Sequence, residues 1–189
     1  MVSNNMEDGR RSYIGKAYNQ VLERLQGYNV EEVNRPGFRD ELWNHFLRLP
    51  VRYALDVNTE KAEDVLMHKK LLELAHDPNI RPVFEVRLVQ GYAFQDNIDH
   101  DSDTVEAREL HTLLHEITIS TIDQPKLLTR MTALLSEVGL DIREAYAFST
   151  SDGYSLDVFV VAGWPYEETD RLIRALEAKI PKLRNLGSF

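Results

Sequence analysis

The sequence predicts an α+β fold in which an N-terminal helical region precedes a C-terminal β-α-β-β-α unit. Three observations support this prediction. Apolar residues recur at intervals of three and four over much of residues 12–76, which is typical of amphipathic helices. Apolar and polar residues alternate in several later segments, which is typical of half-buried strands. The tripeptide Ser151-Asp152-Gly153 lies between the last two of those segments and indicates a hairpin.

The helical region contains three apolar stripes, and a helix breaker follows each of them. The stripes are Ile14, Tyr18, Val21, Leu22 and Leu25; Leu42, Trp43, Phe46 and Leu47; and Ala62, Val65, Leu66, Leu72 and Ala75. The breakers are Gly27, Pro50 and the pair Asp77-Pro78. Short amphipathic helices must bury their apolar faces, so we expect a small bundle or a helical layer on a sheet. A groove that binds a target protein is the alternative.

A solitary strand is expected at residues 83–90 (VFEVRLVQ). The C-terminal unit has no convincing final strand, because Asn185 and Gly187 are poor strand residues. Without a further strand, one edge of the strand that contains residues 116–121 would be open, which favours aggregation. Our hypothesis is that residues 83–90 fill this edge in antiparallel orientation. The alternative is that this strand belongs only to the helical region.

The C-terminal unit starts with a strand in which Ile117, Ile119 and Thr121 share one face. Asp123 follows and is expected to cap a helix, with Pro125 in its first turn. One apolar helix face is formed by Leu127, Leu128, Met131, Leu134, Leu135 and Val138. Gly139 is expected to end this helix in a left-handed conformation.

A second strand and its return strand flank the Ser151-Asp152-Gly153 turn. The first contains Ile142, Ala145, Ala147 and Phe148. In the return strand, residues 154–161, we expect Leu156, Val158 and Val160 on one face and Phe159 and Val161 on the other. Pro165 is expected to open a last helix, whose buried face is Leu172, Ile173, Leu176 and Ile180.

Composition places the chain among soluble, intracellular proteins. Its 189 residues are 43% hydrophobic, which is enough for one or two domains with a real core. There are no cysteines, which excludes disulfides and thiol catalysis, and no apolar run approaches the ~20 residues that span a bilayer. A net charge of −9 argues against nucleic acid as a partner. We therefore expect a cytoplasmic protein with no membrane contact.

The expected organisation has five parts. These are a disordered tail at 1–11, a helical region ending in a strand at 12–90, an acidic linker at 91–112, a folded unit at 113–182 and a tail at 183–189. The linker has three aspartates at calcium-loop spacing but lacks the Gly and Glu that such a loop needs. His111 and His115 are one helical turn apart, without a third metal ligand. We expect no metal, no cofactor and no catalytic site.

Two levels of resemblance follow from these residues. The β-α-β-β-α order, the D-x-P-x-L-L turn that starts at Asp123 and the G-x-[ND]-I helix exit at Gly139 resemble an ACT domain, a ferredoxin-like fold that often binds amino acids. Longer strings, among them LWNHFLRLPVRYALDVNTEKAEDVLMHKKLL and AYAFSTSDGYSLDVFVVAGWPYEET, resemble the N-terminal regulatory half of plant ACT-domain Ser/Thr/Tyr protein kinases of the Raf-like group. This second likeness runs from about Tyr18 to about Ala178. The Gly-rich loop, VAIK-type lysine, HRD and DFG motifs of a kinase are absent from the chain.

The resemblance implies a ligand site where the first strand-to-helix turn meets the exit of the first helix across a dimer interface. The matching positions are Thr121, Asp123, Gln124, Pro125, Lys126 and Leu127, with Asp141. Free N–H groups at the helix start favour a carboxylate, and the two aspartates would hold an ammonium group. The chain departs from the family at Lys126, where a Gly is usual, and at Asp141, where an Asn is usual. The alternative is that Asp123 only caps the helix and Lys126 only faces water.

Three functions are compatible with this interpretation. The first is a regulatory ACT module that senses a small molecule such as an amino acid and forms a homodimer through its sheet or helices, with a kinase domain in a longer product. The alternative is a protein-interaction or dimerisation module that needs no ligand. A nucleic-acid binder is disfavoured, because the aromatic RNP1 pattern is absent and the net charge is negative.

Overall fold

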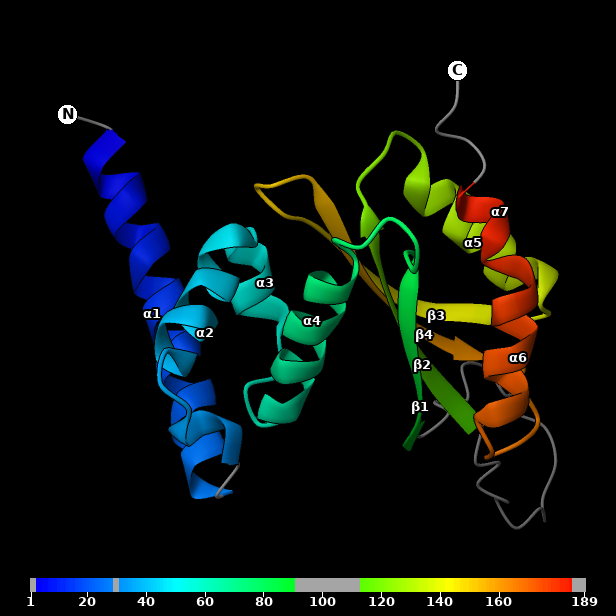
Figure 1. The fold of residues 1–189 in the computed structure, drawn as a ribbon, viewed down its shortest axis with the longest axis horizontal. Helices are drawn as coiled ribbons and strands as arrows, with labels where there is room; N and C mark the ends of the chain where they lie inside the picture. Colours follow the sequence, from blue (N-terminus) through cyan, green and yellow to red (C-terminus); the bar gives the residue numbers. More distant parts are fainter. Residues whose placement is uncertain (1–2, 29–30, 91–112, 185–189) are drawn as a thin grey trace, which may run out of the picture.

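The computed structural model describes residues 3–28, 31–90 and 113–184, and it combines a four-stranded antiparallel sheet with helices on both faces (Figure 1). The N-terminal helices are α1 (Ser3–Gly27), η1 (Glu31–Asn34, a 3-10 helix), α2 (Phe38–Arg48), α3 (Val51–Asp56) and α4 (Ala62–Leu74). The remaining elements are β1 (Val83–Gln90), β2 (Leu113–Ile122), α5 (Leu127–Glu137), β3 (Asp141–Ser149), β4 (Tyr154–Ala162), α6 (Asp170–Lys179) and α7 (Pro181–Arg184). The predicted α+β class is confirmed.

Helix α1 is longer than the sequence indicates. It begins at Ser3, so residues 3–11, expected in a disordered tail, are helical. Its buried residues, Ile14, Ala17, Val21 and Leu25, all follow this extension. No apolar stripe marks the first turns, and a helix extends from a packed segment at far lower cost than it nucleates. The guanidinium of Arg10 also donates to the carbonyl oxygen of Leu47, at 3.5 Å.

The sheet has the order β1-β2-β4-β3. Strand β1 pairs antiparallel with β2, with Val86 opposite Ile117, so the hypothesis that residues 83–90 fill this edge is confirmed. The expected linker at 91–112, which would join these two strands, lies outside the described residues. The domain boundaries inferred from the sequence therefore stay a prediction, with β1 in one expected part and its partner strand in another.

Two apolar clusters fill the space on opposite faces of the sheet. The first lies among α1–α4 and reaches the sheet at Phe148 and Leu156. The second joins the other face to α5, α6 and α7 through residues such as Ile117, Phe159 and Val161. Figure 1 shows the resulting order of layers, with the N-terminal helices, the sheet and then α5 to α7. The N-terminal helices thus form a layer on the sheet, as one of the two expected arrangements requires.

The expected alternation in β4 is confirmed for Leu156, which enters the first cluster, and for Phe159 and Val161, which enter the second. Gly139 ends α5 with φ 88°, as predicted. Two expectations at the C-terminal end were wrong. The last long helix begins at Asp170 rather than at Pro165, and Leu183, expected in a tail, is buried in the second cluster. Leu183 lies three residues after Ile180, but Pro181 between them indicated the end of the preceding helix.

Candidate ligand site at the β2–α5 turn

The turn between β2 and α5 has the features of a type II turn. Pro125 occupies its second position, Lys126 its third with φ 63° and ψ 15°, and the N–H of Leu127 donates to the carbonyl oxygen of Gln124 at 3.1 Å. A positive φ at the third position is most favourable for Gly. Lys126 is the one non-glycine residue with positive φ among the described residues. A Lys therefore holds a strained conformation at the position where related turns carry Gly.

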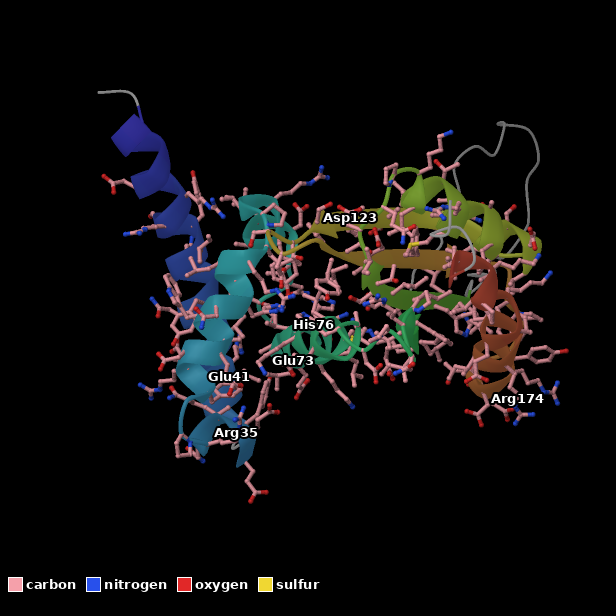
Figure 2. All side chains as sticks on the ribbon, turned by 45° about the horizontal axis from the view of Figure 1, so that its top comes forward. Arg35, Glu41, Glu73, His76, Asp123 and Arg174 are labelled. Carbon is pink, nitrogen blue, oxygen red and sulfur yellow. The ribbon has the colours of Figure 1, made fainter. Side chains whose placement is uncertain are left out.

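The expectation that Asp123 caps the helix was wrong. Helix α5 begins at Leu127, its N-cap residue is Lys126, and no side chain caps it. Asp123 instead donates its backbone N–H to the carbonyl oxygen of Gly153, at 2.9 Å, and its side chain is exposed (labelled in Figure 2). The reason is that a residue before proline avoids the helical conformation. The helix therefore begins after Gln124, and the Asp123 carboxylate does not cap it.

A cavity of about 200 Å³ lies beside this turn. Three elements line it: the turn with the start of α5, strand β3 and strand β4. The lining residues are Asp123, Gln124, Lys126, Leu127, Leu128, Ala147, Phe148, Ser149, Ser155 and Asp157. Gln124 and the Pro125 carbonyl are held in place by Arg130, whose guanidinium donates to them at 3.2 and 3.1 Å. The cavity thus combines a helix start with polar side chains from two strands.

Asp157 on β4 is the most unusual group in the cavity. Its side chain lies in the sheet opposite Ile119 and Ala147, and the residue is only 3% exposed. Its Oδ2 atom is buried without a hydrogen-bond partner in the part of the chain that the structure describes. Burial raises the pKa of Asp157 to about 6, the charge of Asp123 adds to this effect, and the Ser155 hydroxyl opposes it. A buried carboxylate without a counterion is costly.

The structure brings together only part of the predicted site. Asp123, Gln124, Lys126 and Leu127 line the cavity. Thr121 is buried at the end of β2 and Pro125 is exposed, and neither lines it. Asp141 starts β3 opposite Ala162, which is the other end of the strand from Ser149, and it pairs with Arg143 at 3.0 Å. Within one chain, Asp141 is therefore separate from the turn.

Sequence reasoning missed Asp157 and Ser155. Both have the same strand parity as Phe159 and Val161, which face α5, α6 and α7. A carboxylate at an inward position of an otherwise apolar strand is the signal that would have found this site, because buried charges are rare unless they are paired or functional.

Other kinds of site find less support in the described part of the chain. Within residues 3–28, 31–90 and 113–184, no group of three or more His, Asp or Glu side chains is arranged to hold a metal ion. None of the helices in these ranges is long and apolar enough to cross a membrane.

Comparisons with known proteins identify two relatives that match at least 90% of the chain. No family model matches the sequence. The serine/threonine-protein kinase STY46 of Arabidopsis thaliana is 46% identical over an alignment 220 residues long, gaps included. The alignment covers 93% of this chain and 38% of that protein. The serine/threonine-protein kinase STY17 of the same plant is 45% identical over 217 aligned residues, which cover 90% of this chain and 38% of the relative. The chain therefore spans about two fifths of the length of the relatives that it matches.

Proposed function

We propose, on the premise that this chain is homologous to the N-terminal region of the plant ACT-domain kinases represented by STY46 and STY17, that it is the non-catalytic regulatory region of a protein kinase. The sequence contains none of the motifs that hold ATP, metal and the substrate hydroxyl in a kinase. A kinase domain in a longer product would phosphorylate Ser, Thr or Tyr. The present chain would control that domain, in the cytoplasm, rather than perform the reaction.

The proposed signal is a small molecule with an ammonium group, such as an amino acid, bound at the β2–α5 turn. The observation that carries this proposal is the buried Oδ2 atom of Asp157, which has no hydrogen-bond partner among the described residues, in a cavity that Asp123 also lines. An ammonium group with three N–H donors would satisfy the unpartnered oxygen and neutralise the buried charge. It would also relieve the repulsion between the two aspartates.

The carboxylate of the ligand would lie at the start of α5. The N–H of Leu127 is used in the turn, and the N-cap residue Lys126 makes no side-chain cap hydrogen bond to the N–H groups that follow. Free N–H groups at a helix start favour an anion. Lys126 lines the same cavity and supplies a cation at this end. The site would therefore bind both charged groups of an amino acid, the ammonium group through the aspartates and the carboxylate through Lys126 and the helix start.

Homodimerisation is the second part of the proposal. Strand β3 is an edge of the sheet, and most of its residues are exposed. An open edge pairs readily with another strand. Because β3 also lines the ligand cavity, binding and pairing would be linked, so that each changes the equilibrium of the other.

An interaction module that needs no ligand is the competing function. One observation favours it: the side chain of Lys126 itself lines the cavity and would fill the place of the ligand cation by approaching Asp123. In that case pairing through β3 would be constant and indifferent to small molecules.

Light scattering combined with thermal unfolding, each recorded with every one of the twenty amino acids, distinguishes the two functions. A sensor gives one or a few amino acids that raise the melting temperature and change the mass, since a ligand at a hundredfold excess over Kd stabilises the fold by about 2.7 kcal/mol. A constant mass and melting temperature with every amino acid would support the interaction module instead.

A further inference from the structure

A second cavity, of about 280 Å³, lies on the opposite face of the sheet from the β2–α5 turn. Helix α4 and the segment before it form one wall, and strands β1 to β4 form the other. The sheet contributes an apolar floor of Phe148, Val158 and Val160, beside the ring of Tyr146. This volume is close to the lower end of the range of small-molecule sites, and its walls come from two layers of the fold that are far apart in sequence.

An ion cluster with unequal charges lies at this cavity. The guanidinium of Arg87 pairs with both carboxylate oxygens of Asp64, and its Nη2 atom also lies 2.6 Å from Oε1 of Glu116. One positive charge thus serves two carboxylates, whose side chains are only 13% and 14% exposed. These three side chains carry one net negative charge in a largely buried place, and the further cation Lys61 lines the same cavity.

Glu116 has fewer contacts in the cluster than Asp64. Arg87 contacts its Oε1 atom, and no hydrogen bond or ion pair to its second oxygen, Oε2, is present among residues 3–28, 31–90 and 113–184. Burial raises the pKa of Glu116, while Arg87 opposes this shift. The other acids at the cavity differ: Asp56 pairs with Arg52 at 2.9 Å, and Glu144 accepts a hydrogen bond from the Tyr146 hydroxyl at 3.0 Å.

We propose that this cavity binds a small organic amine, with the ammonium group at Glu116 and an apolar body over Val158 and Val160. An anion would meet the net negative charge of the cluster. A metal ion would need several free oxygen ligands, and both Asp64 oxygens are occupied by Arg87. An ammonium group needs only the free oxygen of Glu116 and nearby acceptors. Because the walls come from both layers, the bound amine also strengthens the packing of α4 on the sheet.

Lys61 provides a sharp test, because it lines the cavity and is the cation that an amine would compete with. Its charge lowers the pKa of Glu116, so it lies within electrostatic reach of that carboxylate. Removal of Glu116 charge and removal of Lys61 charge should therefore change amine affinity in opposite directions. A general effect of net charge would appear equally in Glu168→Gln, which removes the same charge as Glu116→Gln but lies outside the cavity.

Phenethylamine and its neutral analogue 2-phenylethanol serve as probes, with calorimetry and thermal unfolding of the full chain as readouts. We expect saturable binding of the amine and at least about tenfold weaker binding of the alcohol, since hydrogen bonds to charged groups contribute most of the difference. Glu116→Gln should weaken the amine by about tenfold or more, and Lys61→Gln should tighten it several-fold. The matched control Glu168→Gln lies outside the cavity and should change neither value.

Three results would overturn the proposal: equal binding of amine and alcohol, no binding of the amine at millimolar concentration, or an unchanged amine affinity in Lys61→Gln. Lys61 is exposed, so we expect Lys61→Gln to fold. Its amine affinity therefore decides the question even if Glu116→Gln does not fold. The same measurements in an Asp157→Asn background, which removes the other carboxylate proposed to bind an ammonium group, should still show weaker binding in Glu116→Gln and tighter binding in Lys61→Gln, so this test is independent of the amino-acid site. Phenylalanine should bind here more weakly than phenethylamine, because its carboxylate meets the same negative charge.

Discussion

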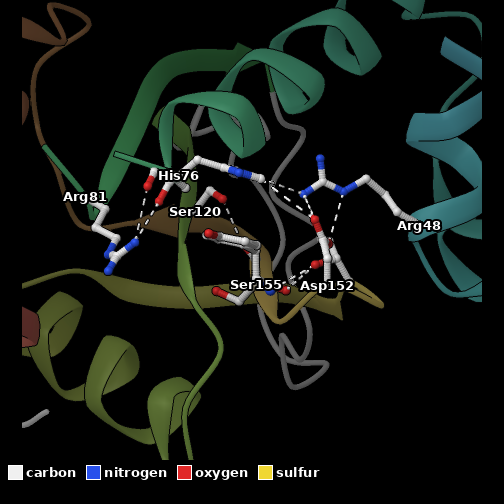
Figure 3. Close-up of polar contacts among 9 residues, drawn as sticks. Arg48, His76, Arg81, Ser120, Asp152 and Ser155 are labelled. Carbon is white, nitrogen blue, oxygen red and sulfur yellow. Dashed lines mark hydrogen bonds and ion pairs between the residues drawn. The ribbon is translucent and has the colours of Figure 1, made fainter. Parts of the chain in front are cut away.

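The guanidinium of Arg48, at the end of α2, donates to both carboxylate oxygens of Asp152, in the turn between β3 and β4 (Figure 3). The two distances are 3.3 and 2.9 Å, although the residues are 104 positions apart in sequence. The N–H of Ser151 also donates to the carbonyl oxygen of Arg48, at 2.8 Å. Beside them, His76 stacks on Tyr154 with ring centroids 4.2 Å apart. These contacts hold the hairpin formed by β3 and β4 against the N-terminal helices.

Asp152→Ala should lower the free energy of unfolding by about 1 kcal/mol, the upper value for a partly exposed ion pair. The estimate is modest because the side chains of Arg48 and Asp152 remain 21% and 44% exposed. Urea unfolding of Asp152→Ala, Arg48→Ala and the double variant would measure the coupling directly. Additive effects of the two single changes would mean that the pair contributes nothing beyond its separate contacts.

Two buried histidines should make the fold sensitive to acid. The hydroxyl of Tyr53 bridges Nε2 of His45, at 3.1 Å, and Nδ1 of His68, at 2.9 Å. Burial lowers the pKa of His68 to about 4 and that of His45 well below its usual value. The unfolded state then binds more protons between pH 4 and 6.5, so stability is complete above pH 6.5 and falls as pH decreases.

For His68 alone, the loss between pH 6.5 and 4 is on the order of 3 kcal/mol, at about 1.4 kcal/mol per pH unit. Urea unfolding from pH 7.5 to 4, together with an NMR titration of the imidazoles, would measure it. If the imidazole of His45 or His68 titrated near pH 6.5 in the folded protein, the assignment of these two side chains as buried and neutral would be wrong.

Asp157 should act in the opposite direction. Because its pKa is raised to about 6 in the folded state, the folded state binds more protons than the unfolded state between about pH 4 and 6. This contribution therefore destabilises the fold as pH rises through that window. Asp157→Asn should consequently stabilise the ligand-free protein at pH 7, by up to about 3 kcal/mol, and make no difference near pH 3.

The same variant tests the account in a second way. Wild type combines the opposing contributions of His68 and Asp157, so Asp157→Asn should show a steeper rise of stability from pH 4 to 6.5. A variant that is less stable than wild type at pH 7 would show that Asp157 already has a satisfactory partner in the free protein.

Lys126 offers a test that separates backbone strain from ligand contact. Lys126→Gly should raise the stability of the ligand-free protein by up to about 1 kcal/mol, because Gly adopts the positive φ of this turn without strain. It should also weaken amino-acid binding by about tenfold, through the loss of the ammonium group that faces the ligand carboxylate.

Lys126→Ala is the matched control, since it removes the same charge but keeps a Cβ atom at positive φ. It should show the loss of affinity without the gain in stability. Tighter binding in both variants would instead identify Lys126 as a side chain that fills the cavity.

Local patterns made most of the fold predictable. Leu134, Leu135 and Gly139 define the face and the end of α5, and the alternation in residues 154–161 assigns each side chain to a face. Strand β1 was predicted for a physical reason, since the edge of β2 needed a partner and residues 83–90 were the available strand. These features depend on neighbours in sequence or on a single pairing rule.

The remaining features depend on contacts between distant segments. The Arg48–Asp152 pair and the Tyr53 bridge follow only from how the helices pack on the sheet. The turn at Pro125 was misjudged because its residues fit both a helix start and a type II turn. Of the seven predicted site residues, Thr121, Pro125 and Asp141 lie outside the cavity, whereas Asp157 completes it.

Titration calorimetry of the amino acid that gives the largest thermal shift tests the central claim most directly, with wild type, Asp157→Asn and the exposed control Glu168→Gln compared at pH 7.5. The account predicts saturable binding to wild type and to Glu168→Gln, and at least about a tenfold loss in Asp157→Asn despite its greater stability. Equal affinity in all three proteins, or no amino acid that binds wild type at millimolar concentration, would contradict it.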